Sequence, residues 1–318
     1  TAVRVCCRDE ALYSNLLGTV AGAVGGPFEG DEIYSRADQR LTNEAALSRG
    51  VEWGRFASTI NMSVIEMDSL FILPGADLTM RLDTDGNALW FGSVNRSVRQ
   101  PSFTDLYYNL GGAQGSIDLE PEWSDNFETG VRANMALSET TSLKFEQTAF
   151  IRQGHNLIDW VRYEGSLTTQ AANLRDVTFN GMETSLLLRC KNNNTIGVSY
   201  TTIKASESSV GFESNYVLDF LRHKLDIRTS LSLPADLTLS LRYSLQDREG
   251  GYYSPVEGEE IEFLPVGLLG ATLSREFMED KLKANVRVDN VLDVALVDIG
   301  NVMLPGRWVR ASLTFVFN

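Results

Sequence analysis

The sequence has no run of about 18 apolar residues, which excludes a membrane-spanning α-helix. A transmembrane β-strand stays possible, because its residues alternate in polarity and average hydropathy hides them. Basic residues are also few: 28 Lys and Arg stand against 42 Asp and Glu, which gives a net charge of −14. Because phosphate binding needs a basic face, we expect no nucleic-acid partner.

Cysteine and histidine are scarce as well. Of the three Cys, Cys6 and Cys7 are adjacent and Cys190 is distant, so they give neither a disulfide framework nor zinc-ligand spacing. The two His, His155 and His223, lie in predicted loops with no nucleophile motif beside them, and no phosphate-binding or dinucleotide-binding glycine motif occurs. We therefore expect no enzyme, no metal site and no cofactor.

What the sequence does contain is polarity that alternates with period two. In residues 236–246, Leu237, Leu239 and Leu241 fall on one face, and Thr238 and Ser240 fall on the other. A strand sorts residues in this way, whereas a helix would scatter them around its circumference.

The same alternation recurs along the chain. Residues 222–233 alternate too, and a turn signal at 233–236 joins them to 236–246 in a predicted hairpin. Further alternating segments are found at 127–137, 142–153, 176–190, 195–205, 282–289 and 309–317. These strands are roughly 10–13 residues long, enough to cross a membrane at a tilt, whereas strands of a soluble sandwich have about 5–6.

The connections alternate in length. Short turns lie near 138–141, 191–194, 234–235 and 276–279. Long connections lie near 98–122, 154–175, 206–221, 249–262 and 291–305. Short turns at one end and long loops at the other are typical of outer-membrane barrels, whose long loops are extracellular.

The predicted fold class is therefore all-β, an antiparallel transmembrane β-barrel. The chain is expected to supply about 12–14 strands, the first 76 residues adding only one to three of them. Residues 29–50 are polar and indicate a long loop.

Five motifs, in order along residues 88–318, resemble those of TonB-dependent outer-membrane receptors. The motif residues are Arg99, Pro101 and Asp105; Leu119, Pro121 and Glu122, then Glu128 and Gly130; Gly181 and Glu183; Asn290 and Asp293; and Pro305, Gly306 and Arg307. The last strand, with Phe315 and Phe317, resembles the signal read by the barrel assembly machinery. More weakly, residues 216–225 resemble a cobalamin-receptor-like subgroup of Bacteroidetes type.

This resemblance implies a larger barrel with a plug domain inside it. Nothing in residues 1–318 resembles that plug, so we expect the chain to be the C-terminal part of the barrel. The resemblance also implies an outer membrane with lipid and lipopolysaccharide as partners, and uptake energised by the TonB complex through the missing plug. The nutrient would be an iron chelate or cobalamin, or a glycan as second choice.

Loop aromatics are candidates for stacking on such a small-molecule ligand. They are Tyr107, Tyr108, Trp160, Tyr252 and Tyr253. Two alternatives stay open at this point: a passive, porin-like channel without a plug, and a soluble carbohydrate-binding β-sandwich.

Overall fold

The computed structural model describes residues 1–14, 24–25, 33–34, 36–163, 165–174, 176–206, 212–214, 217, 220–254, 259–278, 281–298 and 302–316. Almost all regular structure in them is β. No helix in these ranges is long and apolar enough to cross a membrane.

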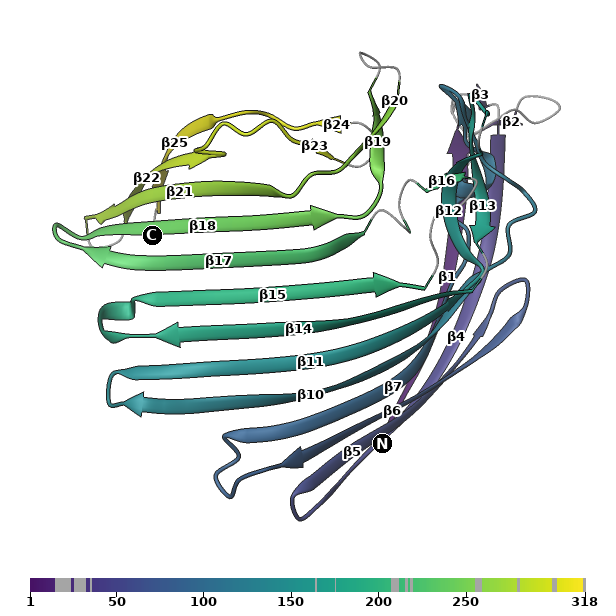
Figure 1. The fold of residues 1–318 in the computed structure, drawn as a ribbon. Coiled ribbons are helices and arrows are strands. Elements are labelled where there is room, and N and C mark those ends of the chain that lie inside the picture. The colour runs from purple at the N-terminus through teal and green to yellow at the C-terminus, as the bar shows by residue number, and fades with distance from the viewer. Residues whose placement is uncertain are drawn as a thin grey trace.

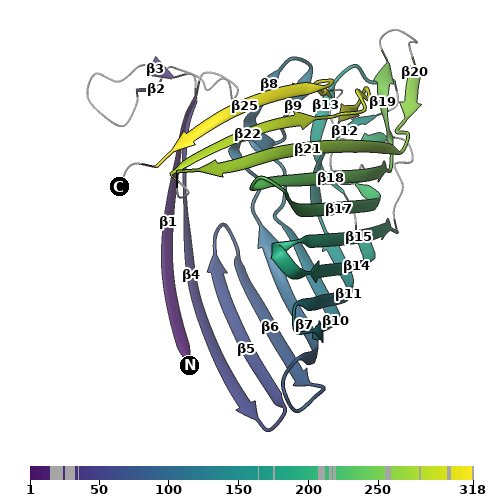
Figure 2. The ribbon, with the colours of Figure 1, turned by 90° about the vertical axis from the view of Figure 1, so that its left-hand side faces the viewer.

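One antiparallel sheet of 14 strands dominates the described residues (Figure 1). Its strands, in spatial order, are β1 (Ala2–Ser14), β4 (Arg36–Trp53), β5 (Phe56–Glu66), β6 (Leu70–Arg81), β7 (Ala88–Arg99), β10 (Glu122–Ser138), β11 (Thr141–His155), β14 (Val177–Arg189), β15 (Thr195–Ala205), β17 (Leu221–Leu233), β18 (Leu237–Arg248), β21 (Val266–Phe277), β22 (Leu282–Asp289) and β25 (Trp308–Phe315). Spatial order follows chain order, as in an up-and-down barrel, and the sheet curves into a trough open between β1 and β25 (Figure 2).

The two ends of the sheet differ, as the connections predicted. At one end, here called the turn end, neighbouring strands are joined by short turns such as that at residues 234–236, where Ala235 and Asp236 have positive φ. The other end, the loop end, carries α1 (Phe103–Tyr107) and four small sheets (Figure 1). These sheets comprise β16 (Phe212–Ser214), β12 (Leu157–Tyr163), β13 (Thr169–Leu174), β9 (Ala113–Gln114) and β8 (Asn109–Leu110); β19 (Gly251–Ser254) and β20 (Glu259–Glu262); β2 (Val24–Gly25) and β3 (Ile33–Tyr34); and β23 (Val297–Asp298) and β24 (Val302–Met303). The short 3-10 helix η1 (Lys191–Asn193) is at the turn end.

The first third of the chain corrects the prediction. Residues 29–50 were expected to form a long loop, but the 18-residue strand β4 covers residues 36–53. Four strands of the large sheet, not one to three, begin before residue 77, and the sheet's 14 strands are at the upper end of the predicted 12–14.

The two faces of the large sheet have opposite chemistry. Apolar side chains on the outer, convex face are left exposed: Val5 is 78% exposed, Leu313 76% and Ile60 65%. The buried apolar cluster of the described residues lies elsewhere, at Leu157, Val161 and their neighbours near the loop end. A single curved sheet with an exposed apolar outer face is the arrangement of a membrane barrel wall, and it rules out the β-sandwich alternative.

Candidate functional site

Helix α1 closes part of the loop end around one buried carboxylate, that of Asp105. Ser102 caps the helix: its hydroxyl accepts from the Asp105 backbone N–H (3.1 Å), and its own N–H and hydroxyl donate to Asp105 Oδ2 (2.8 Å each). This reciprocal capping box satisfies the free donors of a short helix start. The indole N–H of Trp160, from β12, donates to Asp105 Oδ1 (3.2 Å), so the helix is joined to the neighbouring loop sheet.

Arg99 extends this network to the next strand. Its guanidinium lies 3.2 Å from Asp105 and forms a two-pronged pair with Glu122 at 2.8 and 3.0 Å. Glu122 also accepts from the backbone N–H of Ile158 (2.8 Å). Fork-to-fork pairing of this kind fixes direction as well as distance, so the ends of β7, β10 and β12 are held together.

The surroundings of Asp105 favour its charged form. Burial by itself would raise the pKa of this carboxyl, but the hydrogen bonds from Ser102 and Trp160 and the charge of Arg99 hold its pKa below the ordinary 3.8. The network therefore pairs the one guanidinium of Arg99 with two carboxylates, those of Asp105 and Glu122. We call α1 with Arg99, Asp105, Glu122 and Trp160 the loop-end cap.

The cap also reaches back to the first strands. The β5–β6 hairpin ends lower than β4 at the loop end (Figure 2), and α1 contacts β4 there. There the Tyr107 hydroxyl donates to Asp38, the Arg36 guanidinium lies 3.8 Å from the centre of the Tyr107 ring, and Arg40 donates to the Pro101 carbonyl (2.5 Å). Cation–π and hydrogen-bond contacts thus fix the helix against the inner face of the sheet.

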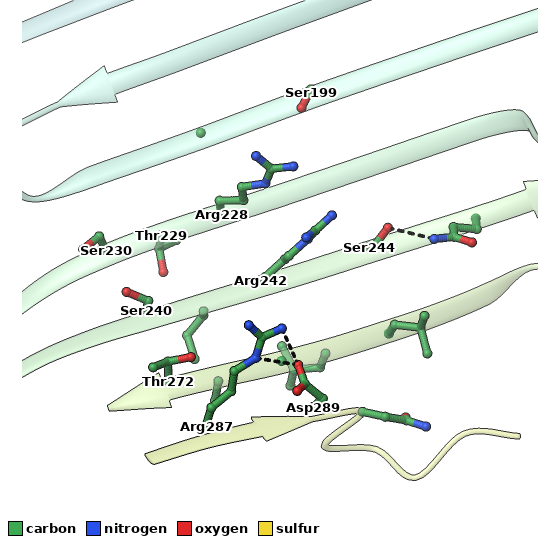
Figure 3. A pocket seen from close by; sticks show the side chains of 18 of the residues that line it. Ser199, Arg228, Thr229, Ser230, Ser240, Arg242, Ser244, Thr272, Arg287 and Asp289 are labelled. Atoms are coloured by element: carbon green, nitrogen blue, oxygen red, sulfur yellow. Dashed lines mark hydrogen bonds and ion pairs between the residues drawn. The ribbon is translucent and has the colours of Figure 1, made fainter. Parts of the chain in front are cut away.

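The inner face of β14 to β25 forms a second feature, a hollow of about 940 Å³. Four arginines line it and point into the trough: Arg228 on β17, Arg242 on β18, Arg287 on β22 and Arg310 on β25. Figure 3 shows the first three among Ser199, Ser230, Ser240 and Thr272. We call these four the arginine wall.

Two carboxylates accompany the arginine wall, and each is shared between two cations. Asp289 lies 2.6 Å from Arg287 and 2.9 Å from Arg310. Asp226 lies 3.3 Å from Arg242 and 3.5 Å from Lys224. The wall consequently has more positive than negative charge, although the whole chain is acidic.

The family model for the β-barrel of TonB-dependent receptor-like proteins matches residues 31–291. The chain belongs to the TonB-dependent receptor family. It is therefore part of an outer-membrane barrel, and the family consists of receptors and not enzymes. No curated protein sequence matches the chain closely enough to count as a relative.

Three solved structures with a similar fold have names that refer to iron or to siderophores. The ferric enterobactin receptor of Pseudomonas aeruginosa matches with a TM-score of 0.68 at 16% identity, over 97% of this chain and 50% of its own. The siderophore receptor PirA of Acinetobacter baumannii has a TM-score of 0.72 at 15% identity, and the match covers 99% of this chain and 52% of PirA. The FrpB iron transporter of Neisseria meningitidis has a TM-score of 0.63 at 13% identity, and the match covers 87% of this chain and 45% of FrpB. The chain thus spans about half the length of these three proteins.

The receptor motifs at Gly130 and Gly181 have a steric reason. A Cβ on Gly130 would lie 2.3 Å from the Gln147 carbonyl oxygen and 2.6 Å from the Phe91 ring, and one on Gly181 would lie 2.6 Å from the Phe150 ring. Each glycine lets an aromatic side chain from the neighbouring strand lie flat across the inner face. Their motif partners Glu128 and Glu183 are both exposed on the same inner face.

The two closing motifs of the receptor barrel meet in space. Asp293 accepts from the Arg307 backbone N–H (2.7 Å), and the Arg307 side chain donates to the Val291 carbonyl (3.0 Å). A Cβ on Gly306 would lie 2.8 Å from the Asp293 carboxylate, and the Asn290 amide donates to the Val294 carbonyl (2.8 Å) and, at 3.5 Å, to that of Pro305. These residues join β22 to β25 at the loop end, and their structural role in the receptor remains a prediction.

The other predicted motif residues are placed as follows. Pro101 is buried and Leu119 and Pro121 are half-buried beside the loop-end cap. Phe315 ends β25 opposite Leu282, and Phe317 lies outside the described residues. A role for Phe315 and Phe317 in barrel assembly remains a prediction.

Three of the five predicted ligand aromatics are brought together. Tyr107 lies in α1, and Tyr108 packs edge-on against Trp160 with ring centres 5.9 Å apart. Their contacts hold the loop-end cap in place, and their binding of a ligand remains a prediction. Tyr252 and Tyr253 lie apart from them in β19, and their side chains are outside the described part of the structure.

The sequence prediction missed the arginine wall. Alternation assigned these arginines to the polar faces of their strands, but no motif marked them. The turn at 234–236 would have given the register that sets Arg228 opposite Arg242, since Leu233 then pairs with Leu237. Arg287 and Arg310 are separated by the long connection between β22 and β25, so no turn fixes their pairing in advance.

Proposed function

We propose that the chain forms part of the wall of an outer-membrane receptor that takes up a bulky iron chelate, energised by the TonB complex. The observation that carries the proposal is the 14-stranded family barrel wall, apolar outside and polar inside. The names of the similar structures, a ferric enterobactin receptor, a siderophore receptor and an iron transporter, favour iron over cobalamin or a glycan.

The remaining partners follow from the same placement. The exposed apolar outer face is suited to outer-membrane lipid and lipopolysaccharide, and the loop end would face the outside of the cell. A plug domain within the trough would connect the receptor to the TonB complex. Under this proposal residues 1–318 are the C-terminal part of the barrel.

Uptake by whole cells tests the proposal. The complete gene is placed in an outer-membrane host that lacks its own iron receptors, with and without a functional TonB complex. We expect radioactive iron offered as a ferric siderophore to accumulate only when TonB functions. Accumulation of labelled cobalamin or a maltodextrin instead would show that the ligand is not an iron chelate. Accumulation that needs no TonB would show that the protein is a passive channel and not an energised receptor.

A matched pair of variants checks the part played by the loop-end cap. Asp105→Ala removes the buried carboxylate, whereas Asp68→Ala changes an exposed residue in the β5–β6 turn. We expect siderophore uptake to fall in the first and to stay unchanged in the second.

A further inference from the structure

We propose that three connections at the loop end form one rigid unit, the loop platform, and that Asp159 is the positioning residue that holds it together. The loop platform is the five-stranded sheet of β16, β12, β13, β9 and β8 (Figure 1 and Figure 2). Its strands come from the connections between β7 and β10, between β11 and β14, and between β15 and β17. The inference goes beyond the proposed function, because it concerns how these connections move and not what the receptor takes up.

Backbone pairing joins the first two of these connections. Strands β9 and β13 run parallel, with Ala113 opposite Thr169 and Gln114 opposite Gln170. The Thr169 N–H donates to the carbonyl of Gly112 (2.8 Å). Because the β10–β11 hairpin of the wall lies between them in sequence, this pairing is a contact between two separate connections and not a local turn.

Asn173 in β13 adds a side-chain link between the same two connections. Its amide oxygen accepts from the Glu120 N–H (2.9 Å), and its NH2 group donates to the carbonyls of Glu120 (3.0 Å) and Asn156 (2.7 Å). The Asn156 amide in turn donates to the Glu120 carboxylate (2.9 Å). Because donor and acceptor of the Asn173 amide are both used, its orientation is fixed and the two connections are held side by side.

Asp159 in β12 joins the second connection to the third. It is only 1% exposed. Its Oδ2 accepts from the hydroxyl of Ser214 in β16 and from the Val217 N–H (3.3 Å), and its Oδ1 accepts from the Trp160 N–H (2.7 Å). Strands β12 and β16 also pair through three residues each. Buried donors that lose their acceptor are costly, so this carboxylate fixes the third connection against β12.

An apolar core fastens the loop platform to the barrel wall. Leu157 and Val161 of β12 and Leu174 of β13 pack with Val177, the fully buried first residue of β14. Leu157 also lies across Gly154 of β11, since a Cβ on that glycine would be 2.8 Å from the leucine side chain. Three or more strands with a packed apolar face form a stable sheet. We therefore expect the loop platform to stay folded on the wall as a whole.

Two other hairpins at the loop end offer a comparison within the same molecule. Among the described residues, β19 with β20 and β23 with β24 form separate two-stranded sheets, and no strand pairs them with the loop platform. A change that acts through the strand pairing of the loop platform should therefore stop before it reaches these hairpins.

Hydrogen exchange of the complete receptor in detergent, followed by mass spectrometry, tests whether the loop platform opens as one unit. Asp159→Asn keeps the shape of the side chain but turns an NH2 group towards hydrogen-bond donors. We expect it to lower the protection of β8, β9, β12, β13 and β16 together by at least about tenfold, and to leave β19 and β20 unchanged. Gln170→Ala, which changes an exposed residue of β13, is the matched control and should have no effect.

The pattern of loss decides the result. Loss confined to β12 and β16 would show that the connections open separately, and no loss at all would show that Asp159 does not position them. Either outcome would overturn the proposal, as would the same loss in Gln170→Ala.

A cross-link between two connections tests the loop platform without a destabilising change. In the receptor with Cys6, Cys7 and Cys190 replaced by serine, Gln114→Cys and Gln170→Cys place two thiols on neighbouring strands, within reach of a disulfide. We expect diamide to close the disulfide and TonB-dependent iron uptake to be the same in the closed and the reduced receptor. Failure of the disulfide to form, or uptake that is blocked by it and restored by reduction, would overturn the proposal.

These readouts separate the loop platform from the proposed function. An unlinked receptor that shows no TonB-dependent iron uptake would overturn the proposed function. The exchange pattern and the formation of the disulfide would still decide whether the three connections form one unit.

Discussion

The loop-end cap and the arginine wall are both built from arginines and carboxylates, but the balance of charge differs between them. In the cap, Arg99 is matched by Asp105 and Glu122, and each carboxylate receives further hydrogen bonds. In the wall, Arg228 faces Arg242, and two carboxylates pair with four cations, none of them Arg228. Matched charges stabilise a structure, whereas unmatched charges of one sign leave capacity for a partner. The difference separates a region held together by its own charges from a region that has charge left for a partner.

The largest expected effect is the loss of the buried carboxylate of the cap. Asp105→Ala removes the acceptor for Ser102 and Trp160 and leaves Arg99 with Glu122 alone. We expect local opening of α1 to become easier by about 3 kcal/mol, a roughly hundredfold loss in hydrogen-exchange protection. Asp68→Ala, in an exposed turn, is the control, and equal protection in both variants would show that the cap is not held by this charge.

Glycines divide the two regions in the same way. Gly130→Ala would push a Cβ to 2.3 Å from the Gln147 carbonyl oxygen, whereas Gly197→Ala meets only ordinary contacts. We expect the first to lower the free energy of unfolding by about 2 kcal/mol and the second to leave it nearly unchanged. Urea unfolding in detergent measures both, and an equal loss would mean that the hollow beside Gly197 is filled.

Acid should weaken the cap before it changes the rest of the loop end. Because the folded pKa of Asp105 is lowered, its stabilising contribution is complete above the ordinary value of 3.8 and is lost as the pH falls below it towards the folded pKa. Trp160 fluorescence, taken as the difference from Trp160→Phe, should follow this loss. Asp105→Asn should abolish the pH dependence, and its persistence in that variant would assign it to another group.

The smallest expected effect has the opposite sign. Arg228→Gln relieves a direct like-charge pair, so it should raise the free energy of unfolding by about 0.5 kcal/mol. The same substitution at Arg99 should lower it, because Arg99 is matched. A loss of stability from Arg228→Gln would show that this arginine already has a partner within the receptor.

The fold could be predicted from the sequence where strands lie within the lipid band. There one face must be apolar, so alternation identified β10, β11, β14, β15, β17 and β18 and their turns. It failed for β4, whose far end continues beyond that band. Gln39 and Asn43 on its outer face are polar like Arg40 on its inner face, so the period of two disappears and the segment resembles a loop.

The candidate site was less accessible for a different reason. Arg99, Asp105 and Glu122 could be named from their motifs, but the Trp160 indole that completes their network is 55 residues from Asp105 in sequence. The arginine wall depends on side chains from four strands whose meeting is set by register and curvature. The spacing of residues along the chain predicts neither the contact of Trp160 with Asp105 nor the meeting of the four arginines.

Neighbouring positions 227 and 228 on β17 offer the most direct test that this sheet is a membrane wall with an apolar outer face and a polar inner face. In the complete receptor with Cys6, Cys7 and Cys190 replaced by serine, single cysteines are placed at Ile227 or at Arg228. Reaction with a water-soluble thiol reagent is then measured in lipid vesicles. We predict that the cysteine at 227 is protected by lipid and that the cysteine at 228 reacts. Equal reactivity at the two positions would contradict the account.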